Sequence, residues 1–484
     1  MKLNNPELLR SQCLINGEWC DALSGKREAV INPATGAELA SIPLVSEEET
    51  LQAIAAAQRA QNEWKQQTAK QRSALLLAWA DKVLAAQEDL AQLMTAEQGK
   101  SLAEARGEVA YAASFITWFA EEAKRVDGAV LQAPQASQRL VVVKQPIGVC
   151  AAITPWNFPA AMITRKVAPA LAAGCAIIVK PAEQTPLTAL ALAKLAQDAG
   201  IPAGVLQVVT GEAAQVGKVL CDSPVVRKLS FTGSTEVGRI LMAQCAPSIK
   251  KLSLELGGNA PVIVFDDANL DAAVAGIMAS KFRNSGQTCV CANRIYVQDG
   301  IYERLAEKLV AAVEQLKVGD GSQEGTTQGP LIDSDAVAKV QSHIDDALIK
   351  GAQIATGGQP HALGGTFFQP TVVTGVTQKM RFAKEETFGP VAPLFRFHDE
   401  AEAIAMANDT EFGLAAYLFT QNAARQWRVP EALEYGMVGI NTGLISNEVA
   451  PFGGVKQSGL GREGSRYGIE EYLELKYLCI DVSC

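Results

Sequence analysis

The chain has 484 residues, of which 48% are hydrophobic and 20% are charged, and this length is typical of two or three globular domains. The formal net charge of −9 disfavours nucleic acid and anionic membrane surfaces, so we expect no partner of either kind. The local basic cluster of Lys250 and Lys251 is interpreted as a solvated strand end.

The first ten residues, MKLNNPELLR, contain no apolar segment of the kind found in signal peptides. The longest weakly polar stretch, residues 167–179, is too short to span a bilayer, and Pro169 and Gly174 interrupt it. We therefore expect a cytoplasmic protein.

Cysteine and histidine usage limits the chemistry. The ten cysteines are scattered without any CxxC pair, which is not the spacing of a disulfide scaffold. The three histidines, His343, His361 and His398, have no metal-like partner nearby, so we expect no metal site. A cysteine nucleophile in this chain would need a base other than histidine.

Residues 46–126 have helical periodicity, and Ser46 with Glu49 forms a capping-box pattern at their start. Residues 139–154 form a β-like run. Strand-like and helix-like segments then alternate, which predicts βαβ units on a parallel sheet. The strands are expected at 175–180, 206–210 and 228–231, and the helices at 188–200, 213–220 and 235–245.

A second alternating stretch begins near residues 261–265 and continues to about residue 445, which predicts a second α/β domain. It includes a helix-like segment at 269–282 and a strand-like segment at 294–297. The last segment, 470–479, alternates like a strand and is suited to pair at an edge with another element or another subunit.

The string GLGREG at 459–464 matches the G-x-G-x-x-G pattern of dinucleotide-binding folds. That fingerprint requires a strand before it and a helix after it within a βαβ unit. Here the preceding residues, PFGGVKQS, indicate a loop. We therefore interpret the string as a glycine-rich connection and not as a phosphate site.

Cys289 lies in FRNSGQTCVCANR, a small polar loop after a helix-like segment, where Gly286 is expected to let the backbone approach a substrate. A thiolate is a strong nucleophile but needs a base or a positive field to form near neutral pH. The alternative is that Cys289 is a small buried hydrophobe.

Two polar residues end or follow apolar strands. Glu255, in LSLELGG, is either a desolvated carboxylate suited to general-base work or a surface charge. Asn157, in the rigid turn PWNFP, has an amide that could donate to an oxyanion, although Asn is also a common turn residue.

The ends of two further strands suggest contacts to a nucleotide. Lys180 and Glu183 follow the strand at 175–180, where ligands bind in α/β sheets, and they could hydrogen-bond ribose hydroxyls. Ser234 opens a helix, whose free N–H groups suit a phosphate, and it is equally suited to be a simple N-cap.

Together these segments resemble the aldehyde dehydrogenase superfamily across the whole chain. The matching strings, in order, are PWNFP, KPAEQTP, FTGSTEVG, LELGG, GQTC, EETFGP and PFGGVKQSGLGREG. The resemblance implies an α/β fold with two Rossmann-like parallel-sheet domains and a small β oligomerisation flap. It places a NAD(P)-binding domain at 1–122 and 146–255, a catalytic domain at 256–445, the flap at 123–145 and 470–484, and a return to the cofactor domain at 446–469.

The resemblance also implies roles for individual residues. Cys289 matches the nucleophile, Glu255 the base, and Asn157, with the Cys289 backbone N–H, the oxyanion hole. The implied reaction forms a thiohemiacetal on Cys289, loses a hydride to the nicotinamide, and ends in hydrolysis of a thioester to the free acid. The cofactor contacts implied in the same way are Trp156, Lys180, Glu183, Gly233, Ser234, Glu386 and Phe388.

The strings ITRK, FRNSGQTCVC and GLISNEVAPFGG are similar to bacterial succinate-semialdehyde dehydrogenases, which act in 4-aminobutyrate degradation. That resemblance implies that Arg165, Arg283 and Ser446 hold a substrate carboxylate, since arginine binds carboxylates with two prongs. Structural ion pairs are the alternative for both arginines. The alternatives are that the enzyme acts on glutarate semialdehyde or that it is an aldehyde dehydrogenase of broad specificity.

Cofactor choice is expected to depend on Glu183, because a carboxylate beside the adenosine ribose accepts bonds from free hydroxyls and repels a 2′-phosphate. This favours NAD, while Lys180 leaves NADP open as the alternative.

The family further implies a homo-oligomer, with near relatives suggesting a tetramer, and a regulatory disulfide between Cys289 and Cys291. A non-enzymatic structural protein on the same fold is the remote alternative, and the presence of both Cys289 and Glu255 argues against it.

Overall fold

Five parallel strands form the centre of the first sheet in the computed structural model, which describes residues 1–483. Two antiparallel strands extend one edge and a third, β19, closes the other. In spatial order the strands are β19 (Gly459–Leu460), β11 (Lys251–Glu255), β10 (Val226–Thr232), β7 (Val149–Ile153), β8 (Ile177–Lys180), β9 (Leu206–Val208), β1 (Cys13–Ile15) and β2 (Glu18–Cys20).

Helices cover this sheet, and three of those in the N-terminal region begin with a capping box, including the expected one at Ser46 and Glu49. Every residue of α5 is buried, which places this helix in the middle of the largest apolar core. The helices are α1 (Glu47–Trp64), α2 (Ala69–Ala85), α3 (Gln87–Gln98), α4 (Leu102–Glu122), α5 (Ala161–Ala173), α6 (Pro186–Asp198), α7 (Ala213–Asp222), α8 (Thr235–Cys245) and α14 (Ser465–Glu470).

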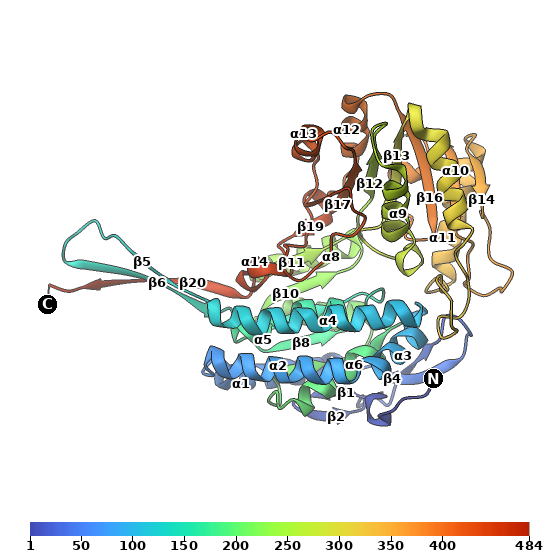
Figure 1. The fold of residues 1–484 in the computed structure, drawn as a ribbon. Helices are drawn as coiled ribbons and strands as arrows, with labels where there is room; N and C mark the ends of the chain where they lie inside the picture. Colours follow the sequence, from blue (N-terminus) through green and yellow to red (C-terminus); the bar gives the residue numbers. More distant parts are fainter. Residues whose placement is uncertain (484) are drawn as a thin grey trace.

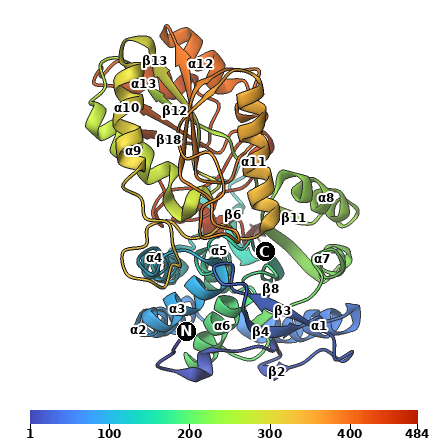
Figure 2. The same cartoon turned by 90° about the vertical axis from the view of Figure 1, so that its right-hand side faces the viewer.

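The second sheet lies above the first in Figure 1, and Figure 2 shows the two halves stacked on one another. All of its neighbouring strands are parallel except the edge pair β14–β15. Its strand order is β14 (Gln353–Thr356), β15 (Thr371–Val376), β16 (Val391–Phe397), β13 (Ala292–Gln298), β12 (Ala260–Val264), β17 (Ala415–Phe419) and β18 (Met437–Ile440), and its helices are α9 (Leu270–Lys281), α10 (Tyr302–Val313), α11 (Ser334–Ile349), α12 (Glu400–Asn408) and α13 (Arg425–Ala432).

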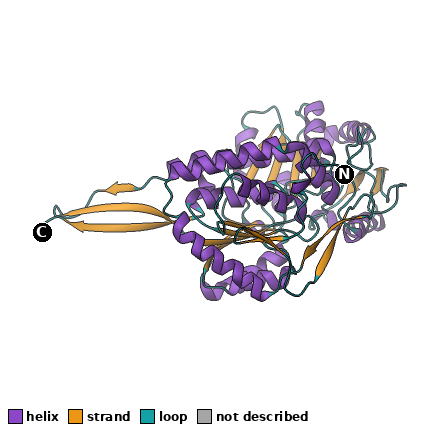
Figure 3. Cartoon of the chain, turned by 90° about the horizontal axis from the view of Figure 1, so that it is seen from below, coloured by secondary structure: helices purple, strands orange, loops and turns teal. Residues whose placement is uncertain are grey.

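A third, antiparallel sheet projects as a long arm from one side of the molecule (Figures 1 and 3). It consists of β5 (Ala129–Leu131), β6 (Gln138–Pro146) and β20 (Leu473–Asp481), with β6 in the middle. The flap expected at 123–145 and 470–484 falls on this arm, except that residue 484 lies outside the described residues. Most of β20 is exposed, so apart from its pairing with β6 this strand makes little contact with the rest of its own chain.

The β-like run at 139–154 is two strands in different sheets and not one. β6 belongs to the arm, whereas β7 is central in the first sheet. The chain turns between them at Gly148, which has a φ of +122°, a conformation that glycine adopts at little cost. Periodicity alone does not reveal this break, because both strands are rich in β-branched residues.

The interpretation of Lys250 as a solvated strand end is wrong. Its side chain is buried, and its ammonium donates to the backbone carbonyls of Ser223, at 2.8 Å, and Val226. Burial lowers the pKa of this lysine. Lysine is rarely buried without partners, and two carbonyl acceptors supply them here.

The glycine-rich string at 459–464 is a connection, as expected. It follows a short 3-10 turn and contains β19, which pairs antiparallel with the end of β11. No helix among residues 1–483 is long and apolar enough to cross a membrane.

The sequence pattern did not predict an N-terminal hairpin, which consists of β3 (Arg27–Ile31) and β4 (Glu38–Pro43). Only one residue of β3 is buried, so the strand lacks the alternating apolar pattern that would mark it.

Candidate active site

The loop that carries Cys289 is held in an unusual backbone conformation. Asn284 and Ser285 both have positive φ values, of 51° and 54°, a conformation uncommon outside glycine and frequent at functional sites. The loop is fixed from outside: the Asn284 N–H donates to Glu104 at 2.7 Å, and the Ser285 hydroxyl donates to the Gly329 carbonyl at 2.9 Å. Surrounding structure therefore determines the path of this segment.

Cys289 lines a cavity of about 280 Å³ between the two sheets, together with Asn157, Ser234 and Glu386. Its backbone passes close to the strand end after Glu255, where a β-carbon on Gly258 would lie 2.6 Å from the Cys289 carbonyl oxygen. Burial raises the pKa of the Cys289 thiol to about 12, and the charge of Arg165 acts in the opposite direction. The resting group is thus a thiol that needs a base before it can attack.

The expectation for Gly286 is wrong. A β-carbon there would lie 2.1 Å from the carbonyl oxygen of Gly389, so the missing side chain makes room for the segment at 385–390. The glycine serves the packing of protein against protein, and not the approach of a substrate.

Asn157 is buried at the same cavity, and its side chain is fixed by a hydrogen bond from Nδ2 to the Gln287 carbonyl at 3.0 Å. An amide nitrogen has two hydrogens, so one remains for another acceptor. Among the hydrogen bonds of residues 1–483, none uses the backbone N–H of Cys289. Two donors are therefore free close to the thiol.

Glu255 ends β11 as a buried carboxyl group, and neither of its oxygens has a hydrogen-bond partner in the described part of the chain. Burial, and next the negative charge of Glu463, raise its pKa well above the usual value. The burial of Glu255 therefore excludes the alternative that this residue is a charge on the protein surface. A carboxyl group of raised pKa is matched to proton transfer near neutral pH.

Glu463 is a second buried carboxylate beside Glu255. It accepts from the Lys166 ammonium and lies 2.9 Å from Nε of Arg165. Burial opposes the charge of Glu463, but these two cations outweigh it and lower its pKa. Neither Glu463 nor Lys166 was singled out by the sequence analysis, because no spacing rule links the strings TRK and GREG.

The first turn of α8 opens onto the Cys289 cavity. Ser234 caps it by accepting from the Val237 N–H at 3.3 Å, and no group among residues 1–483 accepts from the N–H groups of Thr235 or Glu236. Gly233 donates its N–H to the carbonyl of Glu255 at 3.1 Å, which ties this helix start to the end of β11. Free N–H groups at a helix start suit a phosphate.

Opposite α8, the segment at 385–390 presents Glu386 and Phe388 to the cavity. Glu386 accepts from the Gly258 N–H at 3.2 Å, and burial raises its pKa to about 7. Phe388, with a positive φ of 55°, packs edge-on against Trp156 with the ring centroids 5.5 Å apart.

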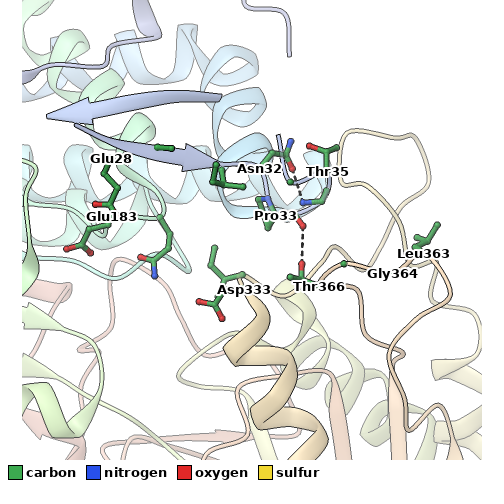
Figure 4. Close-up of a pocket in the computed structure, with 16 residues that line it drawn as sticks. Glu28, Asn32, Pro33, Thr35, Glu183, Asp333, Leu363, Gly364 and Thr366 are labelled. Carbon is green, nitrogen blue, oxygen red and sulfur yellow. Dashed lines mark hydrogen bonds between the residues drawn. The ribbon is translucent and has the colours of Figure 1, made fainter. Parts of the chain in front are cut away.

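Lys180 and Glu183 lie farther along the crevice. The buried Lys180 ammonium pairs with the Glu183 carboxylate, and burial lowers the pKa of Lys180. Glu183 lines a second cavity, of about 580 Å³, shown in Figure 4. Because Ile332 and Asp333 line both cavities, the two share a wall.

These donors and acceptors fit a dinucleotide. Open N–H groups face one part of the crevice, and the carboxylates of Glu183 and Glu386 are placed at either side as acceptors for ribose hydroxyls. No group of three or more His, Cys, Asp or Glu side chains in residues 1–483 is arranged to hold a metal ion.

The two arginines differ in their surroundings. Arg165 is fully buried, with its guanidinium 3.9 Å from the ring centroid of Phe452, and it forms the ion pair with Glu463. Arg283 lies 4.7 Å from the ring centroid of Phe158 and has no ion pair within the described residues. Arg165 thus forms a structural ion pair, which was the alternative to carboxylate binding, whereas Arg283 is free to bind an anion.

The remaining two residues are less defined by contacts. Ser446 is half-buried in the loop after β18. Cys291 is fully buried, and its thiol donates to the Lys281 carbonyl at 3.5 Å, so a disulfide with Cys289 would require this thiol to turn away. The disulfide stays a prediction.

Comparison with known proteins identifies the class. Residues 19–478 match the model of the aldehyde dehydrogenase family, so the chain belongs to this family and is an oxidoreductase that acts on aldehydes. The resemblance in the sequence is thereby confirmed, and so is the fold class.

Several of the similar proteins are semialdehyde dehydrogenases. The chain is 65% identical to the succinate-semialdehyde dehydrogenase [NADP(+)] GabD of Escherichia coli, covering 99% of this chain and all of that protein. It is 64% identical to the glutarate-semialdehyde dehydrogenase of Pseudomonas putida over the whole of both chains. The crystal structure of succinate-semialdehyde dehydrogenase from Burkholderia pseudomallei is 64% identical, with a TM-score of 0.99 over the whole of both chains.

The close passage of Cys289 over Gly258 generates a prediction. Gly258→Ala should displace the Cys289 backbone and lower kcat by roughly 10²-fold, the usual cost of a misplacement of about 1 Å. Gly107→Ala is the matched control, because nothing lies within 4 Å of a β-carbon at this position in α4, and it should leave kcat unchanged. Steady-state kinetics and circular dichroism of both variants provide the measurement. A Gly258→Ala enzyme with normal kcat would contradict this reading of the loop.

Proposed function

We propose that the protein oxidises succinate semialdehyde to succinate with a nicotinamide cofactor, through a covalent intermediate on Cys289. The observation that carries the substrate class is the guanidinium of Arg283, which has no ion pair among residues 1–483 and lies 4.7 Å from the ring centroid of Phe158, the neighbour of Asn157. An unpaired guanidinium in the segment that carries the nucleophile suits an aldehyde with a carboxylate at its far end.

The first half of the proposed reaction forms and oxidises an adduct. The Cys289 thiol gives its proton to solvent water, favoured by the charge of Arg165, the thiolate attacks the aldehyde carbon, and a thiohemiacetal forms. The side-chain N–H of Asn157 and the backbone N–H of Cys289 donate to the oxygen as it gains negative charge. A nicotinamide bound in the crevice would supply the acceptor for the hydride that leaves the adduct, and Cys289 would then carry the acyl group as a thioester.

The second half is hydrolysis. Glu255 takes a proton from a water molecule, the water oxygen attacks the thioester carbonyl, and the Cys289 sulfur leaves as the acid is released. Neither oxygen of Glu255 has a hydrogen-bond partner among residues 1–483, so both are free to accept this proton. Glu463, held by Lys166 and Arg165, keeps a negative charge beside Glu255 and so favours its protonated form after the transfer.

Glutarate semialdehyde, one methylene longer, is the alternative substrate, and the relative from Pseudomonas putida carries that name. A single methylene changes binding by only about 1–3 kcal/mol, so the two substrates can share one site. By resemblance the reaction belongs to 4-aminobutyrate degradation in the cytoplasm.

For the cofactor, the proposal favours NAD over NADP. Lys180, the cation at this end of the crevice, is already paired with Glu183, and the carboxylate is suited to two ribose hydroxyls. The relative from Escherichia coli is named for NADP(+), so this choice separates the chain from that protein.

The role of Glu255 gives a kinetic prediction. Glu255→Gln should retain a rapid burst of about one reduced nicotinamide per active site, because oxidation precedes hydrolysis, and then turn over roughly 10²- to 10⁴-fold more slowly. In the wild type, hydrolysis should fall as the pH drops through the raised pKa of Glu255, because the protonated group cannot accept a proton. Stopped-flow absorbance across pH measures both. An undiminished steady-state rate in the variant would rule out this base.

The role of Arg283 is tested by a pair of substrates. Arg283→Ala should raise KM for succinate semialdehyde by about 10- to 100-fold, the value of a charged hydrogen bond, and leave KM for butanal within about two-fold. Arg428→Ala removes an exposed arginine that pairs with Glu400 and serves as the control. Equal effects of Arg283→Ala on both aldehydes would refute carboxylate binding by this residue.

The projecting arm supports a proposal about assembly. Its apolar side chains are solvent-exposed in the single chain, including Val130 at 80% and Leu475 at 70%, which is expensive unless another subunit covers them. We propose a homo-oligomer built through the arm, with a tetramer as the expected form.

This assembly is tested by charge insertion. Val130→Asp combined with Leu475→Asp should lower the mass measured by light scattering after size exclusion, because buried charges oppose association. The control is Leu23→Asp, which changes a side chain that lies outside the arm and is also 70% exposed. This variant should leave the measured mass unchanged. An unchanged mass in the arm variant would exclude the arm as the interface.

A further inference from the structure

Glu28 brings a second carboxylate to the Lys180–Glu183 end of the crevice. It lies on β3, in the hairpin that the sequence pattern did not reveal, and lines the 580 Å³ cavity together with Glu183. Figure 4 shows the two side chains next to one another at one end of this cavity, although they come from β3 and from the loop after β8.

The electrostatic environment agrees with this placement. Partial desolvation, and next the charge of Glu183, raise the pKa of Glu28, while the charge of Lys180 lowers it. Glu212, which precedes α7, adds a further negative charge that raises the same pKa. Glu28 thus lies in the field of two other carboxylates and one ammonium group.

The cavity offers no other cation. None of its 16 lining residues is lysine or arginine, and Asp333, across the cavity from Glu28 in Figure 4, adds another carboxylate. Lys180 itself is already neutralised by its pair with Glu183. An anion that entered here would meet uncompensated negative charge.

We propose that Glu28 is a second determinant of cofactor choice, which acts with Glu183 to exclude a phosphate from the 2′ position of the adenosine ribose. The proposal deepens the function given above and rests on the adenosine ribose lying at Lys180 and Glu183. A phosphate monoester carries about −1.5 to −2 charges at pH 7, so it is repelled, whereas a 2′-hydroxyl can donate to a carboxylate.

Glu28 keeps a negative charge near Lys180 even when the Glu183 side chain turns away. Glu183 is partly exposed, and if its side chain turned aside, Lys180 would become available to a 2′-phosphate. With Glu28 present, the ammonium still faces a carboxylate. Exchange of Glu183 alone should therefore convert the enzyme to NADP only in part.

The test separates the 2′-phosphate from the rest of the cofactor. Binding of 5′-AMP and of 2′,5′-ADP to the intact protein is measured by titration calorimetry, for the wild type, Glu28→Gln, Glu183→Gln and the double variant. Glu28→Gln should bind 2′,5′-ADP roughly 3- to 10-fold more tightly and 5′-AMP within about two-fold of the wild type, since it removes one like charge. The double variant should bind 2′,5′-ADP more tightly than either single variant.

Two controls address general charge effects. Glu38→Gln makes the same change in the same hairpin, at an exposed residue that does not line the cavity, and should leave both affinities unchanged. The gain in affinity for 2′,5′-ADP caused by Glu28→Gln should also be smaller in about 1 M salt, where the Debye length is about 3 Å.

The outcomes distinguish the inference from the function on which it rests. If Glu183→Gln alters the affinity for these ligands and Glu28→Gln does not, Glu28 has no part in cofactor choice. If neither variant alters either affinity, the cofactor does not lie at Lys180 and Glu183, and the proposed site itself is wrong. An equal gain in Glu38→Gln would also overturn the inference, because the effect would then be one of net charge.

Discussion

The site depends on a buried arrangement of charges where the two sheets meet. Glu463 draws Lys166 and Arg165 into the interior and lies beside Glu255 at the end of β11. Buried charges are costly unless paired, so this group has few alternative arrangements. It fixes α5, which carries both cations, against the glycine-rich connection at 459–464, and it holds one carboxyl group of raised pKa near the thiol.

The crevice continues from there towards the cofactor end. The start of α8 is joined to the end of β11 through Gly233, so open N–H groups and the carboxyl group of Glu255 occupy neighbouring positions. On the opposite wall the backbone of Cys289 passes within reach of Gly258, and Glu386 accepts from the Gly258 N–H. The two glycines after Glu255 thus allow both halves of the molecule to approach one strand end.

The sequence predicted the parallel βαβ units and the segments of the crevice, because apolar runs bounded by glycine and proline have strong local signals. It did not separate β6 from β7, did not reveal β3, and assigned Lys250 to the surface, since these depend on which distant segments pack together. Cys289, Glu255 and Asn157 were found through family strings. Glu463 and Glu28 were missed, because their importance arises from neighbours 208 and 155 residues away along the chain, Glu255 and Glu183.

The most direct measurement is the initial rate of reduced-nicotinamide formation by the purified protein, with succinate semialdehyde and with butanal, each with NAD and with NADP. We expect a kcat/KM for succinate semialdehyde far above that for butanal, with NAD the better cofactor. Equal kcat/KM for the two aldehydes would contradict the carboxylate site around Arg283, and a preference for NADP would contradict the roles given to Glu183 and Glu28.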